Sequence, residues 1–200
     1  MTNLSEELSE LIRSRRSIRK FTREQIPRSA LECIVEAGMY APNAGGRQGT
    51  FIVGVHDAQL AARLGRMNLA KFDRSRLLGS YVSREQPSVI DDAAIANGFY
   101  GAPAVCAVFA QEHFLYSIPD AFCAAENMEL QASALHIASC IVARAEETFD
   151  CEEGRSLMRA WGVPEGYIAR CFVILGHCRG EYPAPKQRKA GRSLIIGGNV

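Results

Sequence analysis

The sequence has no long apolar run and almost no net charge. A membrane-spanning helix needs roughly 20 predominantly apolar residues, and no segment approaches that, so we expect no membrane partner. The 200 residues carry 23 Lys and Arg against 22 Asp and Glu, a net charge of +1. A protein that binds nucleic acid through charge usually has a marked basic excess, so we expect no nucleic-acid partner either. Any electrostatic function must come from local clusters.

The cysteines show no ordered pairing. None of the seven forms a CxxC motif, and most lie in apolar stretches such as PAVCAVF, which favours buried free thiols in a reducing compartment. Cys171 and the pair His177–Cys178 have no second pair at zinc-site spacing. We therefore expect no metal site.

Several motifs of known chemistry are also missing. There is no Walker GxxxxGK[ST], no GxGxxG after a strand and no GxSxG elbow, and the four histidines are scattered. The sequence therefore gives no support for a Ser or Cys hydrolase and assigns no catalytic side chain. The first residues, MTNLSEELSELIRS, lack the basic and apolar regions of a secretory signal, so we expect a cytoplasmic protein.

Apolar residues at helical spacing predict several amphipathic helices. Leu4, Leu8 and Ile12 form such a stripe in the first one, and Ser29 is placed to cap the second. The predicted helices cover residues 3–14, 29–39, 57–67 and 152–161. Between them, APNAGGRQG (41–49) must be a loop, because its glycines and proline break the pattern.

Three short apolar segments predict buried strands, at residues 51–55, 102–110 and 169–176. Residues 121–149 form the longest element and would measure about 43 Å if wholly helical. From Met128 to Ala143 this element is apolar on nearly every face, which predicts burial all round against a second subunit. The alternation of helices and strands indicates one α/β or α+β domain over residues 1–200.

Two basic clusters stand far apart in the chain. The first contains Arg15, Arg16, Ser17 and Arg19, and the second lies in the tail between Lys186 and Arg192. Each cluster alone is compatible with solvated surface charge. The alternative is an anion site, where guanidinium groups, a hydroxyl and backbone N–H groups hold a phosphate.

A set of short motifs occurs in the order found in flavoproteins of the nitroreductase family. These are RRSIRKF (15–21), APNAGGRQ (41–48), GAP (101–103), ASALHIASCIVAR (132–144), GVPEGY (162–167) and VILGHCRGEYPAPKQR (173–188). The chain resembles this family over nearly its whole length. The resemblance implies an α+β nitroreductase-like fold, with a central, mostly antiparallel sheet flanked by helices, in an intertwined homodimer that binds FMN.

The resemblance also implies which residues bind the FMN. The phosphate and ribityl chain would contact Arg15, Arg16, Ser17, Lys186 and Arg188. Arg19 would reach the pyrimidine edge of the flavin ring, with Asn68 near its polar edge. The ring would also be lined by Pro42, Asn43 and Ala44, often from the partner subunit, and by the backbone of Cys140, Ile141, Val142 and Ala143 near N5.

The implied activity is transfer of a hydride from NADH or NADPH, through flavin N5, to a flat electrophile such as a nitroaromatic or quinone. Reduced flavin carries negative charge at N1–O2. The attraction between two opposite unit charges 4 Å apart is roughly 4 kcal/mol at an effective dielectric of 20. A guanidinium there therefore favours reduction.

The sequence departs from the family pattern in places that concern the acceptor. Gly49 and Thr50 replace a Pro-Trp pair, Asn43 replaces a serine, and Ile141 stands where an aromatic residue is usual. The region 68–100, expected to cover the active site, matches least. Two alternatives stay open: a specialised dehydrogenase or dehalogenase acting on a biosynthetic intermediate, and a protein that stores or senses FMN without turnover.

Overall fold

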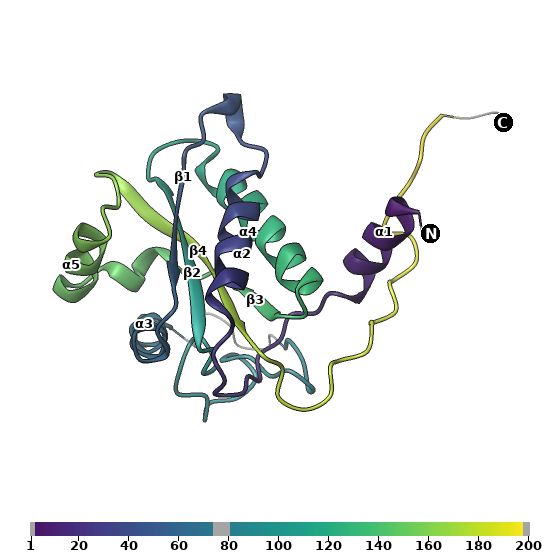
Figure 1. Ribbon diagram of the computed structural model, residues 1–200, viewed down its shortest axis with the longest axis horizontal. Helices are drawn as coiled ribbons and strands as arrows, with labels where there is room; N and C mark the ends of the chain where they lie inside the picture. Colours follow the sequence, from purple (N-terminus) through teal and green to yellow (C-terminus); the bar gives the residue numbers. More distant parts are fainter. Residues whose placement is uncertain (1–2, 74–80, 198–200) are drawn as a thin grey trace.

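The computed structural model describes residues 3–73 and 81–197, and Figure 1 shows their arrangement. The helices are α1 (Leu4–Ser14), α2 (Arg28–Met39), α3 (Ala58–Ala70), α4 (Ser117–Ala134) and α5 (Glu152–Ala160), with 3-10 turns η1 (Ala44–Gly46) and η3 (Glu146–Phe149). The strands are β1 (Thr50–Val55), β2 (Ala104–Gln111), β3 (Ala138–Val142) and β4 (Tyr167–Gly176).

The four strands form one antiparallel sheet in the order β1-β2-β4-β3. The central strands, β2 and β4, are buried along most of their length. Helices or turns cover both faces of these strands, which explains why they appear as continuous apolar runs rather than alternating ones. The α+β fold with a mostly antiparallel sheet, predicted from the family resemblance, is confirmed.

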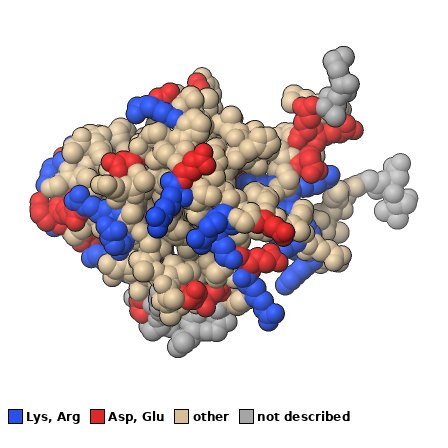
Figure 2. Space-filling view, turned by 60° about the horizontal axis from the view of Figure 1, so that its bottom comes forward, with Lys and Arg blue, Asp and Glu red and all other residues tan. Residues whose placement is uncertain are grey.

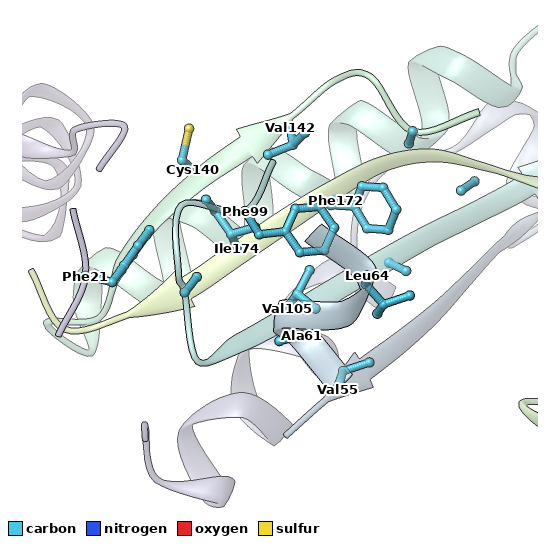
Figure 3. Packing of buried hydrophobic residues seen from close by; sticks show 14 of the residues in the cluster. Phe21, Val55, Ala61, Leu64, Phe99, Val105, Cys140, Val142, Phe172 and Ile174 are labelled. Atoms are coloured by element: carbon cyan, nitrogen blue, oxygen red, sulfur yellow. The ribbon is translucent and has the colours of Figure 1, made fainter. Parts of the chain in front are cut away.

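Each face of the sheet has its own apolar core. On one face, α2 and α4 pack together over the sheet. Gly38 allows this close packing, because a Cβ there would lie 2.8 Å from Ile52 Cδ1 and 2.9 Å from Met128 Cγ. On the other face, α3, η3 and α5 enclose a cluster rich in aromatic residues. Figure 3 shows Phe99 against Phe172 in this cluster, with ring centroids 4.8 Å apart.

The expected long element at 121–149 is not one helix. Helix α4 ends at Ala134, His136 takes a positive φ of 56°, and the chain continues as strand β3. The apolar pattern after Ala134 therefore belongs to a strand beside β4. Burial in a sheet explains this pattern, so it no longer argues for packing against a second subunit.

The other predicted elements are confirmed, with one error at a helix start. Helix α2 begins at Arg28 after Pro27, and no side chain caps it, so Ser29 is not its cap. Proline fixes φ in the helical range, and the Pro27 carbonyl accepts the N–H groups of Ala30 and Leu31. The helix therefore starts without the predicted hydroxyl.

Helix α1 and the C-terminal tail both extend away from the sheet and its helices (Figure 1). The apolar stripe of α1 faces solvent, with Leu4 78%, Leu8 49% and Ile12 50% exposed. In the tail, the three apolar residues from Leu194 to Ile196 are also almost fully exposed. Of the helices in residues 3–73 and 81–197, none is long and apolar enough to cross a membrane.

Candidate functional site

The two basic clusters come together around one cavity of about 220 Å³. Residues 15–19 follow α1, and the tail returns beside them after β4. The cavity is lined by Arg15, Arg16, Ser17, Arg19, Val82, Ser83, Glu85, Gln86, Pro183, Ala184, Lys186 and Arg188. This basic cavity is thus lined by all five residues that the resemblance implies would bind the phosphate and ribityl chain of FMN, and also by Arg19.

The residues after α1 lie between β3 and the tail. On one side, the Ile18 N–H donates to the Ser139 carbonyl at 2.8 Å, which attaches the segment to β3. On the other side, the Arg16 N–H donates to the Tyr182 hydroxyl at 3.0 Å, and Arg16 Nε donates to the Ala184 carbonyl at 3.3 Å. These contacts bring the two basic clusters together.

One arginine that lines the basic cavity has a buried donor without a partner. Among the residues that the structure describes, Arg16 Nη2 is buried and has no hydrogen-bond partner. Arg15 Nη1 is also buried, but it lies 3.0 Å from the Glu129 carboxylate and is paired with it. Leaving a buried charged donor unsatisfied costs free energy. An anion bound in the basic cavity would lie close to the Arg16 guanidinium, because Arg16 lines that cavity.

Glu129, on α4, is a site residue that sequence reasoning missed. Its carboxylate is buried, pairs with Arg15 and accepts a hydrogen bond from Ser139 Oγ at 3.1 Å. Burial raises the pKa of Glu129, and the charge of Arg15 opposes that rise. The only sequence signal was a carboxylate within an apolar helix, which in isolation does not reveal its partner.

Arg19 lies at the edge of the basic cavity and is held by a segment from region 68–100. Its backbone N–H donates to Gln86 Oε1 at 2.6 Å, and its Nη1 donates to the Gln86 carbonyl at 3.2 Å. The Arg19 guanidinium carbon also lies 6.0 Å from the centroid of the Tyr100 ring. Part of region 68–100 therefore contacts the predicted site, while residues 74–80 lie outside the described residues.

The predicted segment Cys140–Ala143 includes the end of β3. Cys140 is buried, and burial raises the pKa of its thiol to about 11, against the opposing charge of Arg19. The thiol is therefore protonated near neutral pH and is a poor nucleophile. This segment can offer backbone and apolar surface to a ligand, but no reactive side chain.

Asn68 and Ala143 line a pocket that is separate from the basic cavity, and the Asn68 amide bonds within the protein. Asn68 Nδ2 donates to the Arg144 carbonyl at 2.5 Å and to Thr148 Oγ1 at 2.9 Å, while Arg144 Nη2 donates to Asn68 Oδ1 at 3.1 Å. The Arg144 guanidinium carbon lies 3.9 Å from the Phe72 ring centroid. Sequence reasoning missed Arg144, which is the next residue after the predicted segment.

Pro42, Asn43 and Ala44 do not join the other predicted residues. Their loop precedes β1, at the end of the sheet where β4 begins, because Thr50 pairs with Ala110 and Ala110 pairs with Ile168. Residues 15–19 instead join the sheet at Ser139, which pairs with Leu175 near the other end of β4. The Ala44 N–H donates to Asp120 Oδ1 at 3.0 Å, and the Gln48 N–H donates to Asn43 Oδ1 at 2.8 Å. Within one chain, the loop is thus held against α4 rather than the basic cavity.

Charge on the surface is mixed rather than arranged in a stripe. On the face drawn in Figure 2, Lys and Arg side chains are interspersed with Asp and Glu. A groove-binding surface for nucleic acid would need a more continuous basic stripe. Among the described residues, no group of three or more His, Cys, Asp or Glu side chains could hold a metal ion.

The buried contact between Glu129 and Arg15 predicts a stability difference. Glu129→Ala leaves the Arg15 guanidinium and the Ser139 hydroxyl without their acceptor, so we expect the free energy of unfolding to fall by about 1–3 kcal/mol. Glu126→Ala, at an exposed position of the same helix, should change it by less than about 0.5 kcal/mol. Urea denaturation measures both. Equal losses in the two variants would contradict the structural role of the buried pair.

Comparison with known proteins supports the fold and identifies the family. The model of the nitroreductase family matches residues 12–177. A nitroreductase of Bacteroides fragilis, solved with bound FMN, is 30% identical, with a TM-score of 0.78 over 98% of this chain and 100% of that one. A nitroreductase of Desulfitobacterium hafniense, also solved with bound FMN, is 24% identical with a TM-score of 0.77 over 98% and 100%.

A curated protein of Archaeoglobus fulgidus is 26% identical over 178 residues, which is 88% of each chain. Its name assigns it provisionally as an NADH dehydrogenase/NAD(P)H nitroreductase. The family match spans β1 to β4 and includes the first basic cluster. This chain belongs to the nitroreductase family.

Proposed function

We propose that this chain is an FMN-dependent oxidoreductase that takes electrons from NADH or NADPH and passes them to a flat electrophile, such as a nitroaromatic or quinone. One observation carries the proposal. Two basic clusters from opposite ends of the chain line one cavity, and Arg16, one of the lining residues, has a buried nitrogen with no hydrogen-bond partner among the described residues. The relative from Bacteroides fragilis, which was solved with FMN, supports the choice of ligand.

The residues of the basic cavity fit a phosphate. Arg15, Arg16, Lys186 and Arg188 supply positive charge, and Ser17 supplies a hydroxyl. Guanidinium groups offer planar pairs of donors that match phosphate oxygens, and charge-assisted hydrogen bonds of this kind are the strong ones. These residues would hold the FMN phosphate and the adjoining ribityl chain.

The flavin ring would extend from the phosphate toward Arg19 and Cys140–Ala143, with Asn68 at its polar edge. When bound, FMN supplies the two-electron transfer between the nicotinamide and the acceptor. Arg19 would stabilise negative charge at N1–O2. The end of β3 would line the ring near N5 with backbone and small or apolar side chains. The Cys140 thiol is protonated near neutral pH, so the proposal assigns no nucleophile to the protein.

We propose further that the chain acts as a homodimer. The apolar stripe of α1 and the apolar tail residues Leu194–Ile196 are exposed in the single chain, and exposed apolar surface of this kind marks subunit contacts. In a dimer, Pro42, Asn43 and Ala44 could approach the flavin ring of the other subunit. The loop that does not reach the basic cavity of its own chain would then complete the partner's site.

Anaerobic reduction tests the proposed function. The purified protein, incubated with FMN, should show a flavin absorption spectrum that NADH or NADPH bleaches and that a nitroaromatic or quinone restores. A protein that stays colourless with FMN would contradict every flavin-based function. If the flavin is bound but neither nicotinamide bleaches it, the oxidoreductase proposal fails, and storage of FMN or a specialised reaction takes its place.

The tail cluster predicts a loss of FMN affinity in one variant. Arg188→Ala removes a cation from the basic cavity, so the dissociation constant of FMN should rise about three- to tenfold. Arg192→Ala removes an exposed tail cation that is not among the residues lining the cavity. This variant should leave the dissociation constant of FMN unchanged. Quenching of FMN fluorescence measures both constants, and equal affinity in all three proteins would remove Arg188 from the phosphate site.

The exposed stripe of α1 predicts the effect of a charge on assembly. Leu8→Glu places a carboxylate in a contact that the homodimer would bury, so sedimentation should show a shift toward monomer. Ala58→Glu adds the same charge at an exposed position of α3 and should leave the dimer intact. A wild-type chain that sediments as a monomer with FMN bound would refute the shared site.

A further inference from the structure

Gln86 holds Arg19 at two points. Its side-chain oxygen accepts the Arg19 backbone N–H at 2.6 Å, and its backbone carbonyl accepts Arg19 Nη1 at 3.2 Å. Gln86 is buried and lines the basic cavity beside Arg19. One residue therefore fixes both the backbone and the guanidinium of the arginine that the proposed function places at N1–O2.

A tight turn fixes Gln86 in place. The Gln86 N–H donates to Ser83 Oγ at 3.1 Å. The Asp91 carboxylate accepts the N–H groups of Val82 at 2.7 Å, Ser88 at 2.7 Å and Ser83 at 3.3 Å. Burial acts to raise the pKa of Asp91, but these hydrogen bonds outweigh it and lower the pKa overall. Asp91 is therefore charged at neutral pH and closes the turn on both sides of Gln86.

Tyr100 also connects the same turn to Arg19. The Val89 N–H donates to the Tyr100 hydroxyl at 3.3 Å, and the Tyr100 ring lies 6.0 Å from the Arg19 guanidinium carbon. Burial raises the pKa of Tyr100, so the phenol is neutral near pH 7. The guanidinium thus contacts both a carbonyl and an aromatic ring, and the segment 82–91 supplies the first and hydrogen-bonds the second.

The groups that hold Arg19 differ in charge from the partner of Arg15. Arg15 is paired with the carboxylate of Glu129, which offsets much of its charge. Arg19 is held by an amide oxygen, a backbone carbonyl and a neutral phenol ring. These contacts restrict its position without cancelling its positive charge. A cation that is fixed in advance stabilises developing negative charge without the cost of reorganising.

We propose that Gln86 is a positioning residue, which fixes Arg19 so that its charge raises the reduction potential of the flavin. The proposal rests on the proposed function, since it needs FMN in the basic cavity. It gives region 68–100, which matches the family pattern least, a specific role. The turn around Gln86 would set how readily the flavin is reduced, while the phosphate residues set how tightly it is held.

Amide exchange in the apoprotein tests the contact without any flavin. Gln86→Met keeps the length of the side chain but removes the oxygen that accepts the Arg19 N–H. We expect the Arg19 amide to exchange with deuterium faster in this variant than in wild type. Gln59→Met, at an exposed position of α3, should leave that exchange rate unchanged. An unchanged rate in Gln86→Met would overturn the positioning role, whatever the flavin does.

The midpoint potential of the FMN-loaded protein tests the consequence. Arg19→Ala and Gln86→Met should each lower the potential, and the double variant should match Arg19→Ala alone, because Gln86 acts through Arg19. Additive shifts, or no shift in Gln86→Met, would overturn the inference while leaving the FMN-dependent function intact. No shift in Arg19→Ala would overturn the N1–O2 role of Arg19 and this inference with it.

A folding control accompanies these measurements. Gln86→Met should keep the wild-type circular dichroism spectrum and thermal midpoint, which separates loss of the contact with Arg19 from loss of the fold. Asp91→Asn provides a second variant, which weakens the turn without altering Gln86 itself. Like Gln86→Met, this variant should raise the exchange rate of the Arg19 amide and lower the midpoint potential of the flavin. A slower exchange or a higher potential would count against the inference.

Discussion

The site depends on the position of residues 15–21, which lie between β3 and the returning tail. The hydrogen bond from Ile18 to the Ser139 carbonyl attaches this segment to the sheet, and the bonds from Arg16 to Tyr182 and Ala184 attach the tail to it. Several positive charges then surround one small cavity. Their mutual repulsion is unfavourable, so the same contacts that complete the fold would favour the binding of an anion such as the proposed phosphate.

Each arginine around the cavity has a different environment, and the environment decides what it can do. Arg15 pairs with a buried carboxylate of α4. Arg16 joins the tail, and among the described residues one of its nitrogens has no hydrogen-bond partner. In the described part of the chain, Arg19 contacts the Gln86 amide oxygen, the Gln86 carbonyl and the Tyr100 ring. The three arginines therefore suit the different roles proposed for them, in structure, phosphate binding and redox tuning, because their partners differ.

The sequence predicted most of the elements and singled out the two basic clusters that line one cavity, because periodicity and clustered charge are local signals. It failed where the information is not local. Residues 138–142 were interpreted as helix, because a buried helix and a buried strand are both apolar on all sides. Glu129, Gln86 and Arg144 were missed because their partners are distant in sequence. The loop at Pro42–Ala44 contacts Asp120 of α4 rather than the residues of the basic cavity, and a sequence pattern does not show which subunit a loop faces.

The most direct measurement of the central claim compares FMN with riboflavin, which has the same ring but no phosphate, in binding to the wild-type apoprotein. If the phosphate satisfies the unpaired guanidinium groups, FMN should bind about a hundredfold more tightly or better, as expected for two charge-assisted hydrogen bonds. Equal affinities for the two flavins would contradict the account, because the basic cavity would then not be a phosphate site.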